Sequence, residues 1–106
     1  MSSLYAKWLI IMNENIMGTL KAEKKHLRER YNVIKLGIFG SYARGEENGS
    51  SDVDILVEFT EVPGMKDFFE TEEYLEKVLH KKIDLVRENA IRPELKEQIL
   101  SEVIYL

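Results

Sequence analysis

Residues 37–59 read GIFGSYARGEENGSSDVDILVEF, and this stretch forms the centre of the predicted fold. The segment Val33–Phe39 is β-branched and apolar and stops at Gly40-Ser41, which predicts a buried strand that runs into a tight turn. A polar connection follows. The segment Asp52–Phe59 then alternates between apolar and other residues, which predicts a second strand with one buried face.

The segments on either side predict helices and one more strand. Apolar residues recur near the 3.6-residue period from Glu14 to about Tyr31 and again from Met65 to about His80, which indicates two amphipathic helices. Lys82–Arg87 has the pattern of a third strand, and Pro93 suits the first turn of a closing helix. The stripe expected to be buried on that helix comprises Leu95, Ile99, Val103 and Leu106. The expected fold class is α/β or α+β, a small mixed β-sheet flanked by helices.

Length and composition limit the other possibilities. The chain has 106 residues, room for one domain, and its net charge is −4. It has no cysteine, which excludes disulfides and thiolate metal sites and favours a reducing, cytoplasmic setting. The longest apolar run, Trp8–Met12, is far shorter than the roughly 20 residues that cross a bilayer, so we expect no membrane span.

The first twelve residues form a separate segment in this interpretation. They are apolar, they contain the only tryptophan, and Leu4, Trp8 and Ile11 fall at helical spacing. Three interpretations stay open: an extension of the next helix, a cover for a partner, and an upstream segment before a start at Met12 or Met17. We therefore divide the chain into an N-terminal extension, residues 1–12, and a domain, residues 13–106.

A basic face is predicted on the first amphipathic helix. Its members are Lys21, Lys24, Lys25, Arg28 and Arg30. Such a run of charges is usually a solvated helix face. Aromatic residues that could stack on bases are not interleaved with these cations, which argues against a nucleic-acid partner.

Three aspartates on predicted strands need an explanation, because aspartate is disfavoured in strands. Asp52 and Asp54 are two residues apart, so their side chains share one face at a spacing of about 6.6 Å. Side chains so placed can converge on two cations roughly 3.5–4 Å apart. Asp84 would complete an all-oxygen site for Mg²⁺ or Mn²⁺ if its strand lies alongside. The alternative for an isolated Asp-x-Asp pair is two solvated acids at a strand start.

The turn after the first predicted strand carries candidate anion ligands. Backbone N–H groups at Gly40, the Ser41 hydroxyl and the Arg44 guanidinium could face a polyphosphate, and glycine permits close approach of the backbone. The alternatives are an ordinary β-turn and, for Arg44, a surface ion pair with Glu46 or Glu47.

Together these residues resemble a known signature. Gly40-Ser41, ten further residues and Asp52-Val53-Asp54 are similar to the motif of the nucleotidyltransferase superfamily that includes DNA polymerase beta. The longer pattern of residues 37–59 resembles its minimal nucleotidyltransferase branch, the antitoxin partners of HEPN-domain toxins. The resemblance covers about residues 14–106 and includes Asp84.

The resemblance implies a polymerase beta-like fold and a role for each motif residue. Gly40, Ser41 and Arg44 would hold the triphosphate of ATP. Asp52 and Asp54 would ligate two Mg²⁺ ions, and Asp84 would bind the catalytic ion and help to deprotonate the attacking hydroxyl.

The implied activity is Mg²⁺-dependent transfer of AMP from ATP to a hydroxyl, a tyrosine by family resemblance, on a HEPN-type toxin. The chain would then act as an antitoxin. Two alternatives stay open: transfer to a small molecule, and a non-catalytic module that neutralises its partner by occlusion. The residues do not specify the preferred base, the acceptor or the oligomeric state, and a homo-oligomer is compatible with them.

Overall fold

The computed structural model describes the backbone of residues 2–106 and the side chains of residues 16–106. The elements follow in the order α1 (Ser2–Tyr31), β1 (Val33–Phe39), α2 (Ser41–Arg44), β2 (Val53–Phe59), α3 (Met65–Leu79), β3 (Ile83–Arg87), the 3₁₀ helix η1 (Glu88–Ala90), α4 (Pro93–Glu102) and β4 (Ile104–Tyr105). Among the helices described, we find none with both the length and the apolar character needed to span a bilayer.

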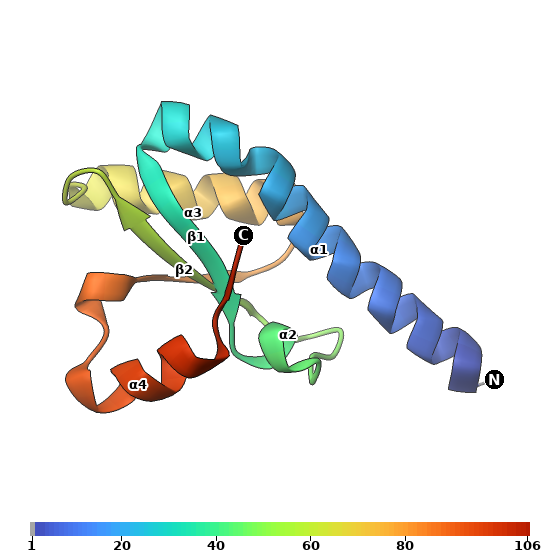
Figure 1. The fold of residues 1–106 in the computed structure, drawn as a ribbon. Helices are drawn as coiled ribbons and strands as arrows, with labels where there is room; N and C mark the ends of the chain where they lie inside the picture. Colours follow the sequence, from blue (N-terminus) through green and yellow to red (C-terminus); the bar gives the residue numbers. More distant parts are fainter. Residues whose placement is uncertain (1) are drawn as a thin grey trace.

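One mixed sheet forms the centre of the molecule, as predicted. Its strand order is β3-β2-β1-β4. β1 pairs with β2 and with β4 in antiparallel fashion, whereas β2 and β3 are parallel. Figure 1 shows α1 and α3 together on one face of the sheet and α4 on the other. The fold class expected from the sequence is therefore confirmed.

Two apolar cores result, one on each face of the sheet. The larger core joins β1, β2 and β3 to α1 and α3, with Leu20, Leu27 and Leu75 fully buried. The smaller core lies under η1 and α4 and is built on Phe39, Leu56 and Ile91. Because both faces of β2 are covered, the strand is buried along nearly all its length.

A buried ion pair reinforces the second face. Glu58 on β2 is 8% exposed and accepts hydrogen bonds from the Arg87 guanidinium at 3.1 and 3.2 Å and from the Asn89 backbone at 2.9 Å. A buried carboxylate is tolerated only when its oxygens are satisfied in this way.

Left-handed residues end the two long helices. Asn32 (φ 61°) follows α1 and His80 (φ 54°) follows α3, and each is in the conformation that commonly terminates a helix. The chain can therefore enter β1 one residue after α1 ends. The amphipathic helices and strands predicted from residues 14–87 agree with α1, β1, β2, α3 and β3.

Several boundaries differ from the prediction. α1 begins at Ser2, so its backbone continues through residues 2–12 as one helix. The face predicted from Leu4, Trp8 and Ile11 lies outside the side chains that the structure describes, and the division at residue 12 stays a prediction. β2 begins at Val53, so Asp52 lies just before the strand.

The closing helix is shorter than its apolar stripe predicted. α4 ends at Glu102, Leu95 is 46% exposed, and the chain continues as β4 beside Gly37 and Ile38. The free edge of β1 offers backbone hydrogen-bond partners to the residues of β4, and these residues could not pair with it if α4 continued. Gly37 makes room for this return, because a Cβ there would lie 2.7 Å from a methyl carbon of Val103.

Candidate active site

The three predicted aspartates meet at one edge of the sheet. β1 ends there, and β2 and β3 both begin there, because β1 is antiparallel to β2 while β3 is parallel to it. Asp54 lies opposite Phe39 on one side and opposite Asp84 on the other. The condition stated for Asp84, that its strand lies alongside, is therefore met at Asp54, and Asp52 comes just before β2.

The carboxylates influence one another electrostatically. Burial, and after it the charges of Asp84 and Asp52, together raise the pKa of Asp54 from 3.8 to about 6. The nearby cation of Arg44 opposes this shift of the pKa. Asp52 and Asp84 are exposed, whereas Asp54 is half-buried. The site therefore contains negative charge that the protein alone does not neutralise.

The side chains do not form a finished metal centre by themselves. Within residues 16–106, no three acidic or histidine side chains converge closely enough to hold an ion. The backbone nevertheless brings Asp54 and Asp84 to paired positions on neighbouring strands, which lie about 4.8 Å apart.

Gly40 joins β1 to α2 in a conformation that only glycine adopts readily. Its backbone angles are φ 72° and ψ −150°. A Cβ at this position would lie 2.0 Å from Oδ2 of Asp54, well inside van der Waals contact. The absence of a side chain therefore lets the turn before Ser41 lie directly against the Asp54 carboxylate.

Arg44 lies at the end of the short helix that follows this turn. Its Nε donates to Glu46 at 2.9 Å, the surface ion pair that the sequence offered as the alternative. Its Nη1 also donates to both oxygens of Glu102, at 3.1 and 3.3 Å. The backbone N–H of Gly40 donates to Oε1 of the same Glu102 at 3.1 Å.

Glu102 was missed by the sequence interpretation. It comes 62 residues after Gly40, at the end of a helix for which only an apolar stripe was considered. One signal was available, because a carboxylate at a helix C-terminus is disfavoured by the helix dipole and needs a compensating contact.

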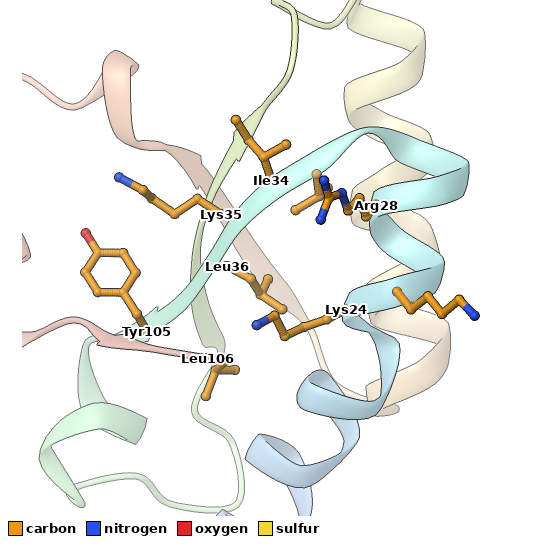
Figure 2. A pocket seen from close by; sticks show the side chains of 9 residues that line it. Lys24, Arg28, Ile34, Lys35, Leu36, Tyr105 and Leu106 are labelled. Carbon is orange, nitrogen blue, oxygen red and sulfur yellow. The ribbon is translucent and has the colours of Figure 1, made fainter.

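Three cavities among the described residues lie away from the aspartates of the site. Figure 2 shows one of about 520 Å³ between α1 and β1, with Lys24 and Arg28 on one side and Ile34 and Tyr105 on the other. Two further cavities are lined in part by Tyr31. None of these three cavities is lined by an aspartate of the site or by residues 40–44.

Comparisons with known proteins agree with this arrangement. The family model of the nucleotidyltransferase domain matches residues 20–106. Because this match spans most of the chain, the chain belongs to the nucleotidyltransferase domain family.

Individual relatives place the chain more narrowly. It is 47% identical over 93 residues to the protein adenylyltransferase MntA of Thermococcus cleftensis, covering 88% of this chain and 94% of that one. A solved structure described as a minimal nucleotidyltransferase superposes with a TM-score of 0.71 at 34% identity, covering 92% of this chain and 95% of that one.

A toxin-antitoxin structure determined with AMP-PNP is also similar. It gives a TM-score of 0.66 at 26% identity and covers 76% of this chain and 66% of that one. The chain is thus similar to minimal nucleotidyltransferases and to named protein adenylyltransferases, and the expected family and enzyme class are confirmed.

The raised pKa of Asp54 predicts that this residue destabilises the cation-free protein near neutral pH. A carboxyl group whose pKa is higher in the folded chain adds stability below the unfolded pKa of 3.8, and that stability is lost as pH rises through about 6. We expect Asp54→Asn to raise the free energy of unfolding at about pH 8 by on the order of 1 kcal/mol, after allowance for solvent screening.

Urea denaturation with a chelator present measures this effect. The gain should shrink toward zero at about pH 4, where Asp54 is protonated in the folded wild-type chain. A gain of equal size at both pH values, or a loss at pH 8, would contradict the electrostatic interpretation.

Proposed function

We propose that this chain transfers AMP from ATP, with Mg²⁺, to a tyrosine hydroxyl on a HEPN-type toxin and so acts as an antitoxin. The observation that carries this proposal is the meeting of three aspartates and the Gly40–Arg44 turn at one sheet edge. Its enzyme class is that of the family to which the chain belongs.

The turn is the proposed site for the triphosphate. Gly40 has no Cβ to block the approach of a phosphate to the turn, and Ser41 offers a hydroxyl donor. Arg44 offers a planar cationic group suited to phosphate oxygens. We assign these three residues to binding and orientation of ATP. Phosphoryl transfer depends mainly on such positioning and on neutralisation of charge.

The aspartates fit a divalent cation. Asp52, Asp54 and Asp84 form an all-oxygen donor set. Burial and then the charges of Asp84 and Asp52 raise the pKa of Asp54, and a bound cation would offset both effects. Bound Mg²⁺ would supply charge stabilisation for the reacting phosphate. We assign Asp52 and Asp54 to both ions and Asp84 to the catalytic ion.

The proposed reaction balances as a substitution at phosphorus. The acceptor oxygen forms a bond to the α-phosphorus of ATP, the bond from that phosphorus to the bridging oxygen breaks, and pyrophosphate leaves. Asp84, which is exposed at the sheet edge, accepts the proton from the hydroxyl. The products are an AMP ester of the acceptor and pyrophosphate.

Two observations support a protein as the acceptor. A relative that covers 88% of this chain carries the name protein adenylyltransferase, and a 26% identical structure is a toxin-antitoxin pair with AMP-PNP. In addition, a chain of 106 residues with one domain leaves little surface for a pocket around a small acceptor. A protein acceptor would supply the complementary surface that completes the site.

Calorimetric titration tests the donor half of this proposal. We expect ATP to bind in the presence of Mg²⁺ and its affinity to fall at least about 10-fold when the cation is chelated, because clustered carboxylates repel the triphosphate until they are neutralised. Asp67→Asn, an exposed position on α3 away from the site, is the matched control and should bind like the wild type. Equal affinity with and without the cation would remove the proposed metal site.

A further inference from the structure

Glu102 connects the end of the chain to the proposed phosphate site. It is the last residue of α4, and Figure 1 shows this end of the helix beside α2 and the end of β1. Its side chain is 21% exposed. It accepts hydrogen bonds from the backbone N–H of Gly40 and from the guanidinium of Arg44.

Glu102 and Asp54 both lie against the turn at Gly40. Asp54 Oδ2 occupies the space of the missing Gly40 side chain, and the Gly40 N–H donates to Glu102 at 3.1 Å. Gly40 is buried, so its N–H needs this partner. Two carboxylates therefore contact Gly40: Asp54 on β2 and Glu102 on α4.

The orientation of Arg44 also depends on Glu102. Nε of Arg44 donates to Glu46 and Nη1 donates to Glu102, so two of the three guanidinium nitrogens have hydrogen-bond partners. Among the residues whose side chains are described, Nη2 has no hydrogen-bond partner. A planar group held at two nitrogens keeps the third in a defined place, which reduces the entropy lost when it binds phosphate.

We propose that Glu102 is a positioning residue for nucleotide binding and transfer, acting through Gly40 and Arg44. This role rests on the proposed function, because it requires the triphosphate to bind at residues 40–44. Glu102 holds the turn against Asp54 and orients Arg44 with Nη2 available to a phosphate oxygen. It does not touch the reacting atoms.

An ordinary surface ion pair would behave differently. Exposed pairs contribute little, and Arg44 is 45% exposed, so the pair alone would leave ATP binding almost unchanged when it is broken. A purely structural contact to the Gly40 N–H would be preserved in Glu102→Gln, whose amide oxygen can still accept. Only the positioning role predicts that ATP binding depends on the charge of Glu102, and that this dependence disappears when Arg44 is absent.

A double-mutant cycle on ATP binding and AMP transfer distinguishes these roles. We expect Glu102→Gln to weaken Mg-ATP binding and to raise KM for ATP about 10-fold with an unchanged melting temperature, because the turn still has an acceptor but Arg44 loses its orientation. In an Arg44→Gln background, Glu102→Gln should cause no further loss, because residues that act as one unit are not additive. Glu97→Gln, exposed on the same helix, is the matched control and should behave like the wild type.

The outcomes separate this role from the proposed function. Unchanged ATP affinity and KM in Glu102→Gln, or losses that multiply independently in the double variant, would overturn the positioning role alone. A wild-type chain that binds no ATP with Mg²⁺ would overturn the proposed function and the positioning role together. The cycle replaces Glu102 with glutamine and not with alanine, because glutamine keeps an acceptor for the Gly40 N–H and so preserves the fold.

Discussion

The variant Asp52→Asn Asp54→Asn is expected to lose AMP transfer by at least about 1,000-fold while keeping its fold. Two of the three carboxylates at the sheet edge become neutral amides, which bind divalent cations weakly, so the phosphate charge is no longer compensated. The fold should persist because Asp52 is exposed and Asp54 carries an unfavourable charge in the cation-free chain. Release of pyrophosphate from ATP in the presence of the partner measures the rate.

The same variant separates catalysis from occlusion. If the toxin is neutralised by modification, the double variant should fail to protect cells that express the toxin, although it still binds the toxin. Asp67→Asn replaces a carboxylate with an amide on the exposed surface of α3 and should protect fully. Full protection by the double variant would contradict an essential role for transfer.

Gly40→Ala is expected to have the second large effect, on activity and on stability together. A non-glycine residue at φ 72° and ψ −150° is strained, and its Cβ would overlap Oδ2 of Asp54 at 2.0 Å. We expect a loss of about 2–4 kcal/mol in the free energy of unfolding, and transfer reduced by about 100-fold or more in the folded fraction. Urea denaturation and initial rates of transfer measure the two effects.

Gly64 provides the matched control for this substitution. It precedes α3 with φ −66°, and no atom lies within 4 Å of the position that a Cβ would occupy. Gly64→Ala should therefore leave both stability and transfer close to the wild type. Equal behaviour of Gly40→Ala and Gly64→Ala would show that the close approach of residue 40 to Asp54 does not matter.

Local patterns in the sequence were enough to predict the central fold. The apolar segment before Gly40 and the alternation after Asp52 each fix a strand by interactions within a few residues. The position of Asp84 beside Asp54 was left as a condition, because strand order in a sheet depends on contacts between distant segments, and the structure meets that condition. These features depend on local periodicity, which a single sequence displays directly.

The features that were missed depend on contacts between distant residues. β4 has two residues and forms only because Gly37 leaves room for it at the edge of β1. Glu102 reaches Gly40 across 62 residues, and its role is visible only once α4 is placed against the second face of the sheet. A helical stripe in the sequence gave no information on where α4 would end.

The intact mass of a partner toxin tests the central claim most directly. The purified chain is incubated with Mg-ATP and a HEPN-type toxin of the same organism, and the mass of the toxin is measured before and after. The account predicts an increase equal to one or more AMP units, absent when the cation is chelated or when Asp52→Asn Asp54→Asn replaces the wild-type chain. A toxin that is neutralised while its mass stays unchanged would contradict AMP transfer and favour neutralisation by occlusion.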